Sequence, residues 1–156
     1  MPRARILTTL ILALVFSSLP AAAKDLAVVV HKNNPAKNVA LADLTKMCKA
    51  SVVKWPDGKD VFLVLRDPAS PEMRLVLQKV YGMSADEVRS LITGANQARK
   101  NHILIVGSDD EVIKAVETIP GAVGIVDVYS ITGGVNVVKV DGKMPLEPGY
   151  ALHGLQ

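Results

Sequence analysis

The stretch VFLVLRDPASPEMRLVL, residues 61–77, holds the signs of a strand, a tight turn and a helix in direct succession. An uninterrupted apolar run ends at Arg66, the turn-forming Pro68 and Pro71 follow, and apolar side chains then return at helical spacing. In open α/β domains, ligands bind outside the carboxyl ends of the strands, where the N-terminus of the next helix presents free N–H groups. The sequence therefore predicts a strand–turn–helix junction with Arg66 and Ser70 as candidate ligand-binding residues.

Strands and helices alternate along the rest of the chain. Apolar, β-branched runs predict strands, and apolar spacing or a capping sequence predicts helices. Ser84 and Glu87 have the spacing of a capping box, and Gly82 just before them predicts the end of the preceding helix. The expected strands are residues 26–30, 61–65, 103–106, 122–128, 135–140 and 150–152, and the expected helices are residues 41–47 and those beginning near residues 71, 85 and 109. Residues 93–102, TGANQARKNH, lack apolar periodicity and predict a polar loop. Because strands separated by helices need crossover connections, we expect an α/β three-layer sandwich with a mainly parallel or mixed sheet.

Residues 1–23 have the pattern of a secretory signal peptide. Two arginines precede the apolar run of residues 6–16, and Ala23 ends a cleavage site of small residues. The apolar run is shorter than the ~20 residues that a membrane-spanning helix needs. We therefore expect cleavage after Ala23, a periplasmic location and a single mature domain of residues 24–156.

The mature chain is close to neutral. Cleavage removes two of the 18 Lys and Arg residues and none of the 15 acidic residues, so 16 basic side chains face 15 acidic ones, a net charge of +1. Charges of both signs are interspersed and aromatic side chains are few. We therefore expect no nucleic acid partner and no attraction to an anionic membrane surface.

The sequence shows no pattern of a metal site or a catalytic centre. Cys48 is the only cysteine, and its helical spacing from Leu41 and Leu44 predicts a buried, unreactive thiol. The three histidines do not have metal-ligand spacing, and there is no nucleophile elbow or phosphate-binding glycine loop. We expect no catalytic residue, no metal, no cofactor and no enzyme activity.

Two interpretations of the Arg66 turn stay open. As a binding site, the guanidinium and the Ser70 hydroxyl would donate to an oxyanion, together with free N–H groups of the following helix. As a structural turn, Ser70 caps that helix and Pro71 takes its first position. In that case Arg66 pairs with one of three acidic residues: Asp67, Glu72 or Asp109.

A second strand-to-helix junction stands at Ser108. The spacing of Ser108 and Glu111 is that of a capping box, and the neighbouring acidic residues favour capping over anion binding. The candidate ligand-binding residues are then Arg66, Ser70, Asp67 and Ser108.

Several motifs together resemble the phosphate-type substrate-binding proteins of ABC transporters, which belong to the type 2 periplasmic-binding-protein-like superfamily. The motifs are LAVVVHKNNPAKNVALADLTKM (residues 26–47), WPDG (55–58), LRDPASPEMR (65–74), SDDEVIKAVETIPGAVGIVDV (108–128) and GYAL (149–152). In this family the ligand loop runs from an Arg to Ser-Gly-Thr at a helix start. Arg66 and Ser70 match that loop, whereas Pro71 and Glu72 stand where glycine and threonine are expected.

The resemblance implies a fold and two classes of function. Full-length members have two lobes that clamp phosphate, and this chain resembles about one lobe. The implied function is a periplasmic solute-binding protein for phosphate or a similar small oxyanion, serving an ABC transporter permease, with homodimerisation as one way to complete the cleft. The alternative is a one-lobe accessory or sensory module that binds a partner such as a membrane receptor, without anion binding.

Overall fold

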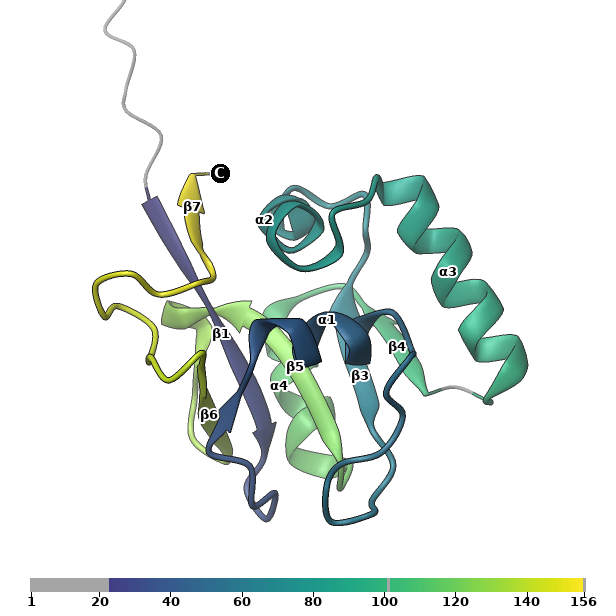
Figure 1. The fold of residues 1–156 in the computed structure, drawn as a ribbon, viewed down its shortest axis with the longest axis horizontal. Helices are drawn as coiled ribbons and strands as arrows, with labels where there is room; N and C mark the ends of the chain where they lie inside the picture. The colour runs from purple at the N-terminus through teal and green to yellow at the C-terminus, as the bar shows by residue number, and fades with distance from the viewer. Residues whose placement is uncertain (1–22, 101, 156) are drawn as a thin grey trace, which may run out of the picture.

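The computed structural model describes residues 23–100 and 102–155, in which one mixed sheet is covered by helices on both faces (Figure 1). The predicted α/β three-layer fold is thus confirmed. The predicted signal peptide, apart from Ala23, lies outside the described residues. Within the described ranges no helix is long and apolar enough to cross a membrane.

Seven strands of the described chain form the sheet in the order β2-β6-β1-β5-β3-β4, and β7 also pairs with β1. Their bounds are β1 (Ala23–His31), β2 (Asn38–Val39), β3 (Phe62–Arg66), β4 (Ile103–Val106), β5 (Ala122–Asp127), β6 (Val135–Val140) and β7 (His153–Leu155). β3 runs parallel to β4 and β5, and β2 runs parallel to β6. β1 is antiparallel to all its partners.

β1 lies in the middle of this sheet because both of its faces are apolar. Val28 and Val30 pack on one side and Val29 on the other, each fully buried. A strand that alternated apolar and polar residues would place polar side chains against one of the two helical layers. The uninterrupted run predicted at residues 26–30 therefore specifies a central position.

The helical segments are α1 (Leu41–Cys48), α2 (Arg74–Val76), α3 (Ala85–Ala98) and α4 (Asp109–Thr118). A 3-10 turn, η1 (Pro71–Met73), and a π turn, η2 (Leu77–Tyr81), extend α2 at its two ends, and a further 3-10 turn, η3 (Val128–Ser130), follows β5. α1 and α2 cover one face of the sheet and α4 covers the opposite face (Figure 1). α4 can approach closely because β5 has Gly124 beneath Val112 and Val116.

Short sequence patterns, such as capping residues and glycine, predicted most helix ends correctly. The capping box predicted at Ser84 and Glu87 is present, with both reciprocal hydrogen bonds formed at the start of α3. The segment that begins at Pro71 ends at Gly82, which has the left-handed conformation (φ +60°) typical of a helix C-terminus.

The polar loop predicted over residues 93–102 is wrong for its first part, because α3 continues to Ala98. The Asn96 side chain explains the difference. Its amide donates to the Ile103 carbonyl (2.8 Å) and accepts from the Ile103 N–H (3.0 Å), which attaches this polar helix end to β4. The spacing of apolar residues cannot predict such a hydrogen bond between a side chain and the backbone of another element.

The strand predicted at residues 150–152 is also wrong. Tyr150 and Leu152 are buried in a turn, and β7 begins one residue later, at His153. The Tyr150 hydroxyl donates to the Leu26 carbonyl (2.7 Å), so this aromatic side chain is fixed against β1 rather than paired in a strand of its own.

Candidate functional site

The candidate site lies at the sheet edge where the parallel strands end. Arg66 ends β3 and is in register with Val106 near the end of β4, and Asp127 ends β5. β1 starts at this edge because it is antiparallel to β5, and α4 begins there as well. Four of these elements, β3, β5, β1 and α4, thus bring polar groups to one edge, where open α/β sheets bind ligands.

Arg66 is neutralised by two carboxylates. Its Nη1 lies 3.1 Å from Asp109 Oδ1, and its Nη2 lies 3.3 Å from Glu72 Oε2. The Arg66 and Asp109 side chains are each 17% exposed, whereas that of Glu72 is 40% exposed. Of the three predicted partners, Asp109 and Glu72 are therefore the ones that the fold selects, and Asp109 makes the more buried contact.

The second oxygen of Asp109 is also fully engaged. Oδ2 accepts from the Ser130 hydroxyl (2.8 Å) and from the Asp127 N–H (3.1 Å). Donors from the end of β3, the end of β5 and η3 therefore converge on one carboxylate. Such a set of charged and neutral donors around two oxygens is the arrangement that proteins use to hold oxyanions.

The network continues outward, and little room remains within it. Lys24 of β1 forms an ion pair with the Asp127 carboxylate at 2.9 Å, while the Asp127 N–H donates a hydrogen bond to Asp109. The cavity between Lys24, Arg66 and Asp109 measures about 10 Å³. That volume holds one water molecule at most, so a phosphate fits only if side chains around the cavity move.

Among the predicted site residues, only Arg66 lies within this network. The Ser70 hydroxyl is buried without a hydrogen-bond partner among the described residues, and it does not cap the following turn. Asp67 accepts from the Ala69 N–H (2.8 Å) and from Arg89 (2.9 Å). These contacts, the Ala69 bond first, hold the pKa of Asp67 below its ordinary value. Asp67 is therefore paired on the exposed side of the turn.

Ser108 caps α4, as one of its two interpretations predicted. Its hydroxyl accepts from the Glu111 N–H (3.2 Å). The reciprocal half of the predicted capping box is missing, because the Glu111 carboxylate instead accepts from the Gly107 N–H (2.7 Å). Ser108 thus has a structural role here.

Sequence reasoning did not identify the donors from β5 and η3. The Ser130 hydroxyl and the Asp127 N–H reach Asp109 only because β5 lies next to β3 in the sheet. An Asp-x-x-Ser pattern directly after an apolar strand is the one local signal at this position. Asp109 itself was recognised as a partner of Arg66, but not as the centre of a donor set.

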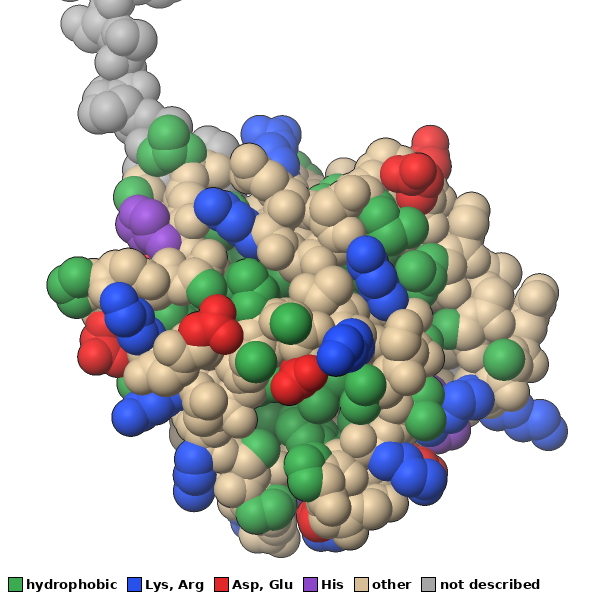
Figure 2. Space-filling view, viewed as in Figure 1, with side chains coloured by type: hydrophobic (Ala, Val, Ile, Leu, Met, Phe, Trp, Pro, Cys, Tyr) green, Lys and Arg blue, Asp and Glu red, His purple; other side chains and the backbone are tan. Residues whose placement is uncertain are grey.

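Larger hollows lie elsewhere on the described chain, and one of about 530 Å³ runs along the exposed side of α3 at Arg89 and Thr93. A groove of about 580 Å³ between α1 and the turn at Trp55 has an apolar floor that includes Val39 and Met47, and Figure 2 shows hydrophobic side chains lining it. Another hollow, of about 330 Å³, lies between Tyr129 and His153. None of these three contains Arg66.

Reactive and metal-binding groups are not part of the site. The predicted burial of Cys48 is confirmed, and this burial raises the pKa of its thiol to about 12. Within the described ranges, no group of three or more His, Cys, Asp or Glu side chains is arranged to hold a metal ion.

The solved structures that share this fold include proteins described as phosphate transport receptors or phosphate-binding proteins. An ABC-type phosphate transport receptor from Vibrio cholerae has a TM-score of 0.65 at 18% identity, over 85% of this chain and 54% of its own. PstS from Borrelia burgdorferi has a TM-score of 0.66 at 15% identity, over 86% and 56%. A phosphate-binding protein from Stenotrophomonas maltophilia has a TM-score of 0.62 at 19% identity, over 81% and 42%. The sequence matches no protein-family model and no curated protein.

The likeness establishes the fold class. The chain has a periplasmic-binding-protein-like α/β fold, as its motifs predicted, and it spans about half the length of these neighbours. Identities below 20% in these three comparisons support a shared fold and leave the ligand to be argued from the residues of the site.

Proposed function

We propose that this protein is a periplasmic solute-binding module for phosphate or a similar small oxyanion, that it serves an ABC transporter permease, and that it is not an enzyme. One observation carries the proposal: the Arg66 guanidinium, the Asp127 N–H and the Ser130 hydroxyl converge on two oxygens of a single anion, which here belongs to Asp109. Phosphate offers oxygens to the same donors. The fold shared with phosphate-binding proteins supports this assignment.

The location follows from the predicted signal peptide. Cleavage after Ala23 would leave residues 24–156 in the periplasm, where a binding module meets a membrane permease. Signal-peptide cleavage is measured by N-terminal sequencing of the protein from a periplasmic extract, which should begin at Lys24.

Isothermal titration calorimetry with phosphate and sulfate tests the binding. Binding should be lost in Arg66→Ala, because the guanidinium supplies the only charged donor among the three. Arg89→Ala is the matched control: it removes a guanidinium from the other side of the same turn, where Arg89 pairs with Asp67 at 2.9 Å. This control should bind as the unchanged protein does. Absence of heat with every anion, in protein that melts cooperatively, would contradict the proposal.

The second candidate is a one-lobe accessory or sensory module that binds a partner protein and no anion. It is favoured by the closed state of the site, in which Asp109 and Glu72 already neutralise Arg66. A membrane receptor is the expected partner. The calorimetry separates the two candidates, because this one predicts no anion binding in the folded, unchanged protein.

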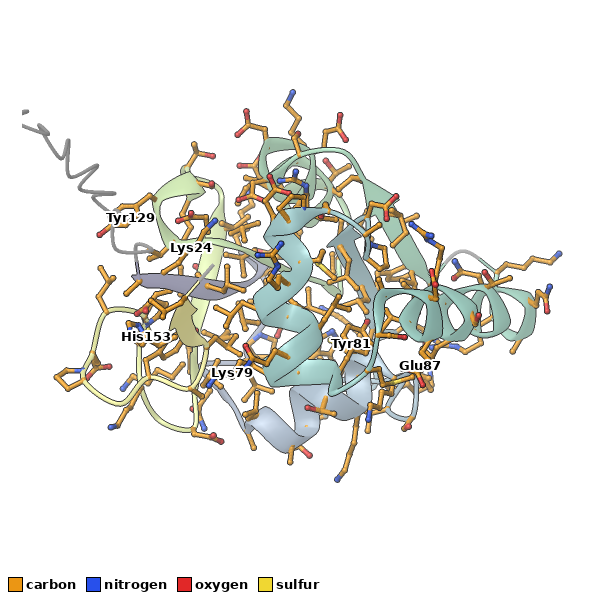
Figure 3. The ribbon with its side chains drawn as sticks, turned by 90° about the horizontal axis from the view of Figure 1, so that it is seen from above. Lys24, Lys79, Tyr81, Glu87, Tyr129 and His153 are labelled. Atoms are coloured by element: carbon orange, nitrogen blue, oxygen red, sulfur yellow. The ribbon has the colours of Figure 1, made fainter. Side chains whose placement is uncertain are left out.

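A homodimer is the arrangement that we propose for covering the site edge. Tyr129, next to Ser130, is 84% exposed, and Leu146 is 60% exposed across the same hollow. Figure 3 shows Tyr129 projecting away from the ribbon near Lys24. A second copy laid on these side chains would exclude water from both sites, and sedimentation velocity measures whether it does.

A further inference from the structure

We propose that Asp109 is a built-in competitor of the anion: its carboxylate occupies the place of a bound oxyanion among Arg66, Asp127 and Ser130, and keeps the site closed until it is displaced. This inference rests on the proposed function, since it names the residue that regulates the same site. It assigns to Asp109 a role opposite to that of a ligand-binding residue.

Helix capping does not explain the position of Asp109. The Ser108 hydroxyl already accepts from the Glu111 N–H (3.2 Å), and the Glu111 carboxylate holds the Gly107 N–H (2.7 Å). Asp110 shares the first turn of α4 and is exposed. An acidic side chain in this turn therefore does not need to face the sheet, and Asp109 faces it because the donors are there.

Each oxygen of Asp109 has the contacts that a bound anion would need. Oδ1 receives Arg66 Nη1 at 3.1 Å, and Oδ2 receives the Ser130 hydroxyl at 2.8 Å and the Asp127 N–H at 3.1 Å. The three donors come from three separate elements, so the Asp109 carboxylate is the group that unites them. Removing it would leave the Asp127 N–H and the Ser130 hydroxyl without this acceptor, and Arg66 with Glu72 alone.

A further hydroxyl on the turn after Arg66 has no acceptor in the described part of the chain. The Ser70 hydroxyl is buried and has no hydrogen-bond partner among the described residues. A buried hydroxyl without a partner is unfavourable, and an anion oxygen that entered the turn would supply an acceptor. This observation is independent of the contacts made by Asp109.

Glu72 is the weaker of the two internal carboxylates. It reaches Arg66 Nη2 at 3.3 Å and is 40% exposed, more than twice the 17% of Asp109. An exposed ion pair is screened by water and salt, whereas a tethered, mostly buried carboxylate competes at a high effective concentration. Asp109 should therefore dominate the competition.

Calorimetric titration of inorganic phosphate into a set of variants tests the inference. We expect Asp109→Ala to bind at least about tenfold more tightly than the unchanged protein, a difference of about 1.4 kcal/mol. Asp110→Asn removes the same charge from the same helical turn and should not change the affinity. Glu72→Gln should give a smaller gain than Asp109→Ala, and Arg66→Ala should abolish binding in the Asp109→Ala background.

Asp109→Asn keeps the test decisive if the alanine variant does not fold. It retains an oxygen that can accept from Ser130 and Asp127 but no longer neutralises Arg66, so its affinity should still exceed that of Asp110→Asn. Equal affinities in the Asp109 and Asp110 variants would overturn the inference, because the gain would then be a general effect of charge.

The outcomes separate this inference from the proposed function. Binding in Asp109→Ala but not in the unchanged protein supports the competitor and refutes anion uptake by the closed site. Suppose that the unchanged protein binds phosphate through Arg66 and that Asp109→Ala gains no affinity. This result supports the proposed anion-binding function and overturns the role of Asp109 as a competitor. No binding in any folded variant overturns both.

Discussion

Gly124→Ala should destabilise the protein because α4 packs directly on this glycine. Gly124 lies in β5, in register with Val29 of β1 and Val64 of β3. A Cβ there would lie 2.5 Å from Val112 Cγ1 and 3.2 Å from a methyl of Val116. Since carbon atoms in contact are about 3.5–4.0 Å apart, α4 must move by roughly 1 Å or the valines must leave their rotamers. Such overpacking costs about 1–3 kcal/mol of unfolding free energy.

Equilibrium unfolding in urea measures this loss, with Trp55 as the probe. Trp55 is the only tryptophan, is buried, and donates from its indole N–H to the Gly121 carbonyl (2.8 Å), so its fluorescence reports on the folded core. Gly94→Ala is the matched control. Gly94 lies within α3, and a Cβ added there would meet no atom within 4 Å, so alanine should stabilise the protein by about 0.5–1 kcal/mol.

A double-mutant cycle tests whether the loss of stability in Gly124→Ala comes from the contact with Val112. Val112→Ala alone should cost about 2 kcal/mol through lost burial, but it also removes the methyl that a Cβ at Gly124 would strike. The double variant should therefore be more stable than the sum of the single changes predicts, by at least about 1 kcal/mol. A neutral Gly124→Ala, or strict additivity with Val112→Ala, would refute the close packing of α4.

Two further predictions concern the thiol and the proposed dimer. The thiol of Cys48 should resist iodoacetamide in the folded protein near neutral pH and react readily in concentrated guanidinium chloride; reaction at equal rates would contradict its burial. Since burial raises its pKa from 9.0 to about 12, the neutral thiol stabilises the fold fully below pH 9.0, and this contribution declines as the pH rises toward 12. Tyr129→Ser should lower the dimer fraction in sedimentation velocity while changing the unfolding free energy by less than about 0.5 kcal/mol; an unchanged dimer fraction would exclude this surface.

The sequence predicted those features whose causes are local. The buried strands followed from runs of β-branched residues, the start of α3 from the Ser84 capping box, and the end of η2 from Gly82. Each depends on residues within a few positions of one another. The mixed sheet followed from the alternation of strands and helices.

The centre of the site depends on sheet order and was not predictable in the same way. Arg66 was identified because it ends an apolar strand, but Ser130 meets Asp109 only through the pairing of β5 with β3. No spacing rule relates these residues. The helical end at Asn96 was missed for the same reason, since its anchor is the backbone of Ile103 in another element.

The central position of β1 determines when the sheet can form. Val28 pairs with Ile125 of β5 and with Val138 of β6, so the middle of the sheet joins segments separated by roughly a hundred residues, and closing such loops is slow. A nascent chain that has not yet extended past β5 lacks the neighbours of its first strand. The middle of the sheet therefore cannot form before β5 and β6 have been synthesised, and a chain whose central strand is still unpaired is compatible with the export route that we propose.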